Sequence, residues 1–188
     1  MRLFPRRRPT PTPTPAPQAT PQTWTPEGTT VTQRYLGLAG ATVLVYSSGS
    51  LYFAASCLGC TYQAATDQEL REAKAAELAN AHAAQCRALP RGVPERPDDA
   101  TAATIVRTRV RELQRYVDER HFTLDDFLAD RVYLQRGRDW ILAALIDLAE
   151  REPQVLKVTV GRPSESGNTY TYLTALPRQS CTTTSDWR

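Results

Sequence analysis

Four residues of the types that bind transition metals form two closely spaced pairs. Cys57 and Cys60 make a Cys-x-x-Cys segment, and His82 and Cys86 make a His-x-x-x-Cys segment after 21 intervening residues. Thiolate and imidazole suit zinc, and a structural zinc site takes four such ligands in a tetrahedron. The chain has four cysteines and two histidines, so most of them belong to this pattern. The spacing therefore predicts one Zn²⁺ site made by these four residues.

The first pair should follow a β-hairpin. Residues 42–46 and 51–55 are rich in β-branched, aromatic and small apolar side chains, and the segment Ser-Ser-Gly at 47–49 separates them. Residues 30–35 predict one more strand before this hairpin. Gly59 lies between the two cysteines and lets the chain turn tightly there. The predicted hairpin therefore delivers the Cys-x-x-Cys turn at its end.

The second pair should lie on a helix. Thr66 and Glu69 have the spacing of a capping box, and residues 66–87 carry apolar side chains at helical intervals. Residues four apart share one face of a helix, so His82 and Cys86 should point the same way. A hairpin packed on this helix would bring both ligand pairs together.

This pattern predicts structural zinc and no enzyme. All four coordination positions are filled by protein, whereas a catalytic zinc keeps one position for water or substrate. Neither His-Glu-x-x-His, a Gly-x-Ser-x-Gly elbow nor a phosphate-binding loop occurs in the sequence. His121 stands alone and is expected to cap a helix end. No catalytic residue and no small-molecule substrate are predicted.

Residues 42–88 resemble the ββα zinc-finger and zinc-knuckle families that use three cysteines and one histidine. The resemblance implies a zinc-stabilised module of hairpin and helix. Common fingers separate their ligand pairs by about a dozen residues, so the gap of 21 departs from that pattern. The Ala-, Arg-, Thr- and Pro-heavy composition is typical of high-GC bacteria, and the chain resembles zinc-finger proteins of such organisms.

The second half predicts three helices followed by a β-hairpin. The helices are expected at about 98–120, just after Thr123, and at 138–151, and the strands at 155–160 and 169–173. This order resembles the winged-helix family over residues 98–177, with the segment Lys157 to Tyr172 as the wing. The predicted fold class is α+β, with a small zinc module and a three-helix winged-helix-like domain.

A DNA-binding surface is predicted from six arginines. Three of them lie four apart on the first helix of the second half, and the others precede the third helix or lie in the wing. They are Arg107, Arg111, Arg115, Arg136, Arg138 and Arg162. An ordinary solvated helix face is the alternative interpretation of the first three. Asp139, Asp147 and Glu150 face outward on the third helix, and carboxylates oppose contact with phosphates.

Positive charge is concentrated at the start of the chain. Four arginines and eight of the 14 prolines precede Glu27, the first acidic residue, whereas residues 27–188 carry 19 basic and 20 acidic side chains. Alternating proline favours an extended, semi-stiff arm that is either simply solvated or contacts phosphates or a proline-binding partner. The predicted division is a disordered arm (1–26), a zinc-binding ββα-type module (27–88), a linker (89–97), a winged-helix-like domain (98–178) and a polar tail (179–188).

Two functions are compatible with these features. The first is a cytoplasmic, zinc-containing protein that associates with DNA as an accessory or regulatory factor, such as one carried by a mobile genetic element. The second is an adaptor that binds other proteins and no nucleic acid, which the nearly neutral charge of residues 27–188 favours. A cytoplasmic location is expected because neither a signal peptide nor a membrane-spanning segment is recognised. Paired cysteines in a reducing compartment indicate metal more than disulfide.

Overall fold

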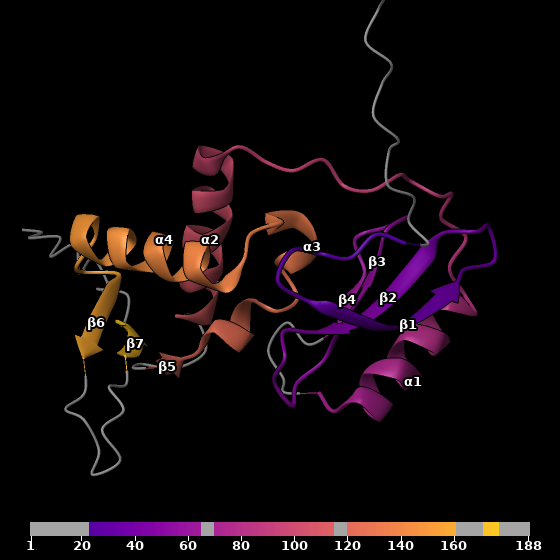
Figure 1. Cartoon of the computed structure of the whole chain (residues 1–188), viewed down its shortest axis with the longest axis horizontal. Coiled ribbons are helices and arrows are strands. Elements are labelled where there is room, and N and C mark those ends of the chain that lie inside the picture. The colour runs from indigo at the N-terminus through magenta and orange to yellow at the C-terminus, as the bar shows by residue number, and fades with distance from the viewer. Residues whose placement is uncertain (1–22, 65–69, 115–119, 161–170, 177–188) are drawn as a thin grey trace, which may run out of the picture.

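The computed structural model describes residues 23–64, 70–114, 120–160 and 171–176. It is a mixed α+β structure in which two antiparallel sheets, each with its own helices, lie at opposite ends of the molecule (Figure 1). Residues 1–22 of the predicted arm, the tip of the predicted wing and the predicted tail lie outside the described residues, so these remain predictions. The predicted end of the arm at residue 26 is wrong, because Trp24 packs on the folded protein and its carbonyl accepts a hydrogen bond from Arg34. None of the described helices is long and apolar enough to cross a membrane.

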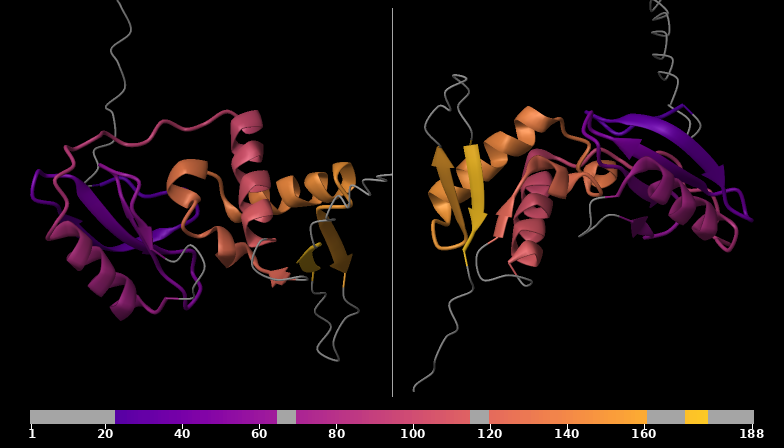
Figure 2. Two further views of the ribbon diagram at one scale, coloured as in Figure 1. Left: turned by 180° about the vertical axis from the view of Figure 1, so that it is seen from behind. Right: turned by 90° about the horizontal axis from the view of Figure 1, so that it is seen from below.

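The first sheet has four strands in the order β1-β2-β3-β4. They are β1 (Thr30–Leu36), β2 (Thr42–Ser47), β3 (Ala54–Cys57) and β4 (Gln63–Ala64), and helix α1 (Glu72–Ala83) lies along one face of this sheet (Figure 2). Every residue of β2 is buried, and alternate side chains of a strand point to opposite faces. Val43 and Val45 pack with α1, whereas Leu44 and Tyr46 pack on the other face.

The second sheet has three strands in the order β5-β7-β6. The elements of this region are α2 (Asp99–Leu113), β5 (Arg120–Phe122), the 3₁₀ helix η1 (Leu124–Phe127), α3 (Arg131–Leu134), α4 (Arg138–Arg151), β6 (Leu156–Val160) and β7 (Thr171–Ala175). Its core consists of large side chains from α2, η1, α4 and the sheet, including Leu113, Phe127, Ile141 and Leu145. The predicted hairpin of β6 and β7 is therefore part of a three-stranded sheet.

Local sequence signals explain several helix starts in this region. The Asp98 carboxylate accepts the backbone N–H of Thr101 at 2.7 Å and caps α2. Thr123 caps η1, and its own N–H donates to the Asp126 carboxylate at 2.8 Å, which completes a capping box. Helix α4 spans the residues that the sequence predicts, with Gly137 at its N-cap.

Two predicted helix boundaries are wrong. The helix expected at 98–120 ends at Leu113, because residues from Arg120 onward pair with β7 as a strand. Helix α1 begins at Glu72, because Leu70 forms a β-bridge with Phe53 and is itself held in an extended pairing. Strand pairing thus competes with helix propagation at both places. The expected capping box at 66–69 lies outside the described residues.

A third core cluster joins the two ends of the molecule. Leu44, Tyr46 and Leu58 from the first region pack with Leu128 and Val132 from the second. The Tyr46 hydroxyl donates to the backbone carbonyl of Ala129 at 3.0 Å. Residues 124–134 thereby cover the face of the first sheet that α1 leaves open, as Figure 1 shows for α3. Contacts therefore join the residues before the predicted linker to the residues after it. The domain division itself stays a prediction.

Candidate metal centre

Strand β3 and the turn after it position the first ligand pair. Cys57 is the last residue of β3, and its N–H donates to the carbonyl of Tyr62 at 3.0 Å, which closes the turn. The N–H of Leu58 donates to the carbonyl of Thr42 at 2.8 Å. A Cβ atom on Gly59 would lie 2.4 Å from the Cβ of Ala41, so only glycine fits this close approach. The predicted need for glycine between the two cysteines is thus explained by packing.

The end of α1 positions the second ligand pair. His82 belongs to the last turn of the helix, and Cys86 follows the helix end at Ala83. The prediction that both lie within one helix is therefore wrong in detail. The N–H of Cys86 nevertheless donates to the carbonyl of His82 at 2.9 Å, so one further turn keeps both side chains on the same side. The Cys86 carbonyl in turn accepts the N–H of Leu38 at 2.9 Å.

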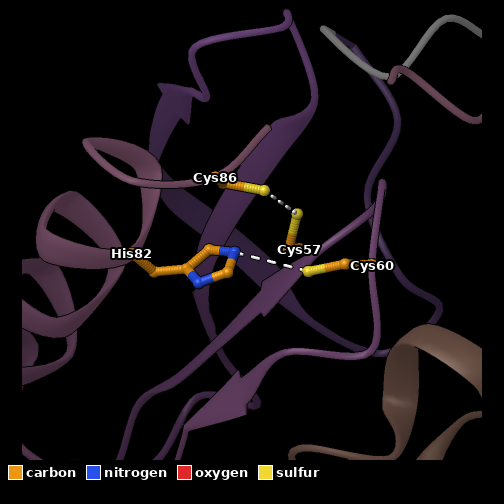
Figure 3. Close-up of side chains that lie close together, drawn as sticks. All are labelled: Cys57, Cys60, His82 and Cys86. Carbon is orange, nitrogen blue, oxygen red and sulfur yellow. Dashed lines mark hydrogen bonds between the residues drawn. The ribbon is translucent and has the colours of Figure 1, made fainter. Parts of the chain in front are cut away.

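The four predicted ligands converge on one point. Their ligand atoms all lie within 4.8 Å of one another, as the close-up in Figure 3 shows. The distance is 3.4 Å from Cys60 Sγ to His82 Nε2 and 3.9 Å from Cys57 Sγ to Cys86 Sγ. A tetrahedral zinc with bonds of about 2.3 Å to sulfur and 2.0 Å to nitrogen separates its ligand atoms by roughly 3.5–3.8 Å. The cluster therefore matches the size of a zinc site.

A disulfide does not account for this arrangement. Bonded sulfurs lie about 2.05 Å apart, whereas the Sγ atoms of Cys57 and Cys86 are separated by 3.9 Å. Cys57, Cys60 and Cys86 are all free thiols. In the part of the chain that the structure describes, these four residues are the one group of His, Cys, Asp and Glu side chains placed closely enough to hold a metal ion.

Burial at the site disfavours uncompensated charge on the Cys57 thiol and the His82 imidazole. Burial raises the pKa of the Cys57 thiol to about 11, although the backbone N–H groups of Gly59 and Cys60 oppose this shift. Burial also lowers the pKa of His82, which keeps its imidazole neutral and able to donate a lone pair. A bound cation would offset the cost of burying thiolates, and its binding would release their protons. The donor set and its surroundings therefore fit zinc.

One aromatic neighbour of the site was missed by the sequence analysis. The Tyr62 ring stacks on the His82 imidazole, with ring centroids 3.9 Å apart and planes 6° from parallel. Nothing in the sequence marks this tyrosine, because the contact spans a loop and a helix. A groove of about 320 Å³ also opens beside Cys60, between the ligand turn, residues 91–94 and α3.

The arginines predicted to bind DNA are largely engaged within the protein. Arg107 and Arg111 both bind the Glu152 carboxylate, at 2.6 Å and 3.3 Å. The Arg136 side chain is 5% exposed and binds Asp99 at 2.8 Å. Arg138 is exposed at the start of α4, whereas Arg115 and Arg162 lie outside the described residues. The described members therefore do not gather into one free basic surface.

Comparison with protein-family models, curated proteins and solved structures found no match for this chain. The geometry by itself thus supports a Cys₃His group that could hold a metal ion.

Proposed function

We propose that this chain is a zinc-stabilised adaptor whose two regions bind other proteins. The convergence of four ligand atoms within 4.8 Å, from elements far apart in the sequence, carries the zinc part of the proposal, and the use of charge described below supports the adaptor part. When bound, zinc supplies a cross-link between β3 and the end of α1. Cys57, Cys60, His82 and Cys86 would hold it, and the chain's free thiols favour a reducing compartment such as the cytosol.

A structural role is favoured over catalysis. The protein provides four ligands, which leaves no coordination position for water or substrate. Cys57 and Cys86 are almost fully buried, so the inner side of the site is closed to solvent. We therefore propose a non-enzymatic protein in which the metal maintains the fold.

The adaptor role is favoured because arginines that could bind phosphates form ion pairs within the protein. Glu152 neutralises Arg107 and Arg111, and Asp99 pairs with buried Arg136. Asp139, Asp147 and Glu150 lie exposed along α4, the helix that would enter DNA in a winged-helix domain. Arg138 and Arg151 are exposed on the same helix, and Arg151 pairs with Asp147, so α4 presents mixed charge with no excess of positive charge for phosphates.

A winged-helix-like architecture for the second region is part of this proposal. Its support is the element order, in which α2 and β5 are followed by the 3₁₀ helix η1, by α3 and α4, and then by β6 and β7. Strand β5 pairs with β7, which gives the sheet order β5-β7-β6. The hairpin loop that would form the wing lies outside the described residues. The fold alone does not decide between DNA and protein as the partner.

Association with DNA is the second candidate, and the charge of the first residues favours it. Arg2, Arg6, Arg7 and Arg8 precede any acidic residue. Such an arm binds phosphates without reading sequence, and each neutralised phosphate steepens the salt dependence by about 0.9 on logarithmic axes. DNA binding through the arm would leave the adaptor role of the folded regions intact.

Two measurements test these proposals. Metal analysis of the purified protein should find one zinc per chain, and clearly substoichiometric zinc after refolding with zinc would contradict the metal site. A salt-dependent titration with duplex DNA should compare the full chain with a chain that begins at Thr23. This start retains Trp24, which packs on the cluster shared by the two regions.

The adaptor proposal predicts that the shortened chain has no salt-sensitive affinity for DNA. Arg107→Glu together with Arg111→Glu should then leave DNA binding of the full chain unchanged. If the shortened chain binds duplex DNA and the double reversal abolishes this binding, DNA association through the folded region replaces the adaptor proposal.

A further inference from the structure

Tyr62 contacts both halves of the proposed zinc site. It lies two residues after Cys60, in the loop that follows the ligand turn, and it is partly buried against the core beneath α1. Its backbone carbonyl accepts the N–H of Cys57 at 3.0 Å. The main chain of Tyr62 thus holds one ligand pair, and its side chain reaches the other.

The side chain of Tyr62 is fixed at two points on α1. Its ring lies parallel to the His82 imidazole, with centroids 3.9 Å apart. Its hydroxyl donates to the carbonyl of Leu78 at 3.2 Å, and Leu78 lies one helical turn before His82. Because the hydroxyl and the ring both contact the same helix, the tyrosine ring is held parallel to the His82 imidazole.

This stacking restricts the rotation of the histidine ring. A parallel neighbour at 3.9 Å leaves the imidazole free to slide in its plane but opposes its turning about the Cβ–Cγ bond. Two orientations related by a half-turn keep the ring in this plane, and the observed one directs Nε2 at Cys60 Sγ, 3.4 Å away. The ligand is therefore aimed at the metal position by a neighbour that donates nothing to the metal itself.

We propose that Tyr62 is a positioning residue for the zinc site, which presets the imidazole of His82 for coordination through Nε2. The inference rests on the proposed zinc binding. A ligand held in its bound orientation loses less freedom when the metal arrives, so affinity rises without a new bond. Partners that hydrogen-bond the second ring nitrogen of a metal-binding histidine typically change metal affinity about 10–100-fold, and we expect a stacking partner to act at the lower end of that range.

The test is a chelator-competition measurement of zinc affinity for the full chain and its variants. Tyr62→Leu removes the stacking and should weaken zinc binding about 10-fold. Tyr62→Phe keeps the ring and loses only the hydroxyl bond to Leu78, so it should stay within a few-fold of wild type. The matched control is Tyr35→Leu, because Tyr35 packs against the same core while its hydroxyl bonds Gln33.

A double-variant cycle separates positioning from general damage to the fold. In a His82→Cys background no imidazole remains to be oriented, so adding Tyr62→Leu should cost little further affinity. The absorption spectrum of Co²⁺ in place of zinc should shift for Tyr62→Leu and stay unchanged for Tyr35→Leu. Both readouts respond to ligand orientation and are insensitive to a small loss of core packing.

The outcomes distinguish this inference from the proposed function. A wild-type protein that binds no zinc overturns the proposed metal site and the role of Tyr62 with it. If wild type binds zinc but Tyr62→Leu weakens it no more than Tyr35→Leu does, the positioning role alone is overturned. An equal loss of affinity from Tyr62→Leu in the wild-type and His82→Cys backgrounds likewise assigns Tyr62 a merely structural role.

Discussion

The two regions of the molecule are packed with side chains of very different size. In the first, the buried face of α1 consists of Ala75, Ala79 and Ala83, and this face packs on Val43 and Val45. In the second, α4 buries Ile141, Leu145 and Leu148 against further leucine, valine and phenylalanine. Apolar burial stabilises by about 25 cal/mol per Å², so alanines contribute far less than leucines.

This difference indicates where a bound metal would stabilise the fold most. Helix α1 approaches the sheet closely because its side chains are small, but it buries little apolar area in doing so. A zinc ion between Cys57, Cys60, His82 and Cys86 would tie the end of this helix to β3 and supply the missing stabilisation. The second region holds a core of its own, so it should depend on metal only through the cluster that both regions share.

The largest expected effect follows loss of a metal ligand. Cys60→Ala should abolish zinc binding and unfold α1 and its sheet, because structural zinc contributes on the order of 10 kcal/mol to small modules. Hydrogen exchange should then become fast at residues 72–83 and stay slow at residues 141–148. Cys181→Ala serves as the control that removes a thiol outside the cluster. Equal loss of protection in both helices would show that the regions form one cooperative unit.

A core truncation in the second region should give the reverse result. Leu145 is fully buried, and Leu145→Ala should destabilise this region by about 2–5 kcal/mol through lost contacts and a cavity. Zinc stoichiometry should remain at one per chain, and α1 should keep its slow exchange. Denaturant unfolding followed by hydrogen exchange measures both. Loss of zinc in this variant would contradict the view that the first region depends on metal and the second on packing.

The part of the second region that packs on the first sheet should respond to pH through Asp130, which precedes α3. Burial raises the pKa of this carboxyl to about 6, although Arg109 opposes the shift, whereas the unfolded chain has a value of about 3.9. The folded state therefore binds the proton more tightly, so this group's contribution to stability is full below about pH 4 and is lost as pH rises through 6.

Asp130→Asn should consequently stabilise the protein most at neutral pH. The gain in unfolding free energy should be at most about 3 kcal/mol at pH 7.5 and smaller at pH 5. The difference between the pKa of Asp130 in the folded and unfolded protein sets this limit. Comparing variant and wild type at each pH cancels the pH dependence of zinc binding that both share. A gain that grows toward acid pH would show that the Arg109 ion pair outweighs burial.

The smallest expected effect concerns the contact between the regions. Tyr46→Phe removes the hydroxyl that donates to the carbonyl of Ala129 and pairs with Ser56. Gln63 still donates to that carbonyl at 2.8 Å, so the cost should be only about 1 kcal/mol. Thermal melting of the zinc-bound variant should show a wider separation between the transitions of the two regions. Unchanged coupling would show that apolar packing alone joins them.

Short-range signals in the sequence predicted much of this structure. The ligand quartet follows from spacings of three and four residues, which a turn and a helical turn convert directly into a shared direction. The caps at Asp98 and Thr123, and the full extent of α4, follow in the same way because a side chain and a nearby backbone group decide them.

Long-range contacts decided the rest. The bridge between Phe53 and Leu70 moved the start of α1, and pairing with β7 turned the expected end of a helix into β5. The stacking of Tyr62 on His82 and the pairing of Arg107 with Glu152 join residues 20 and 45 positions apart. Sequence spacing carries no record of such partners, because the free energy that selects them arises only when separate elements pack. The sequence by itself therefore determined which residues could bind a metal, whereas the tertiary structure decided how they are aimed and which charges remain free.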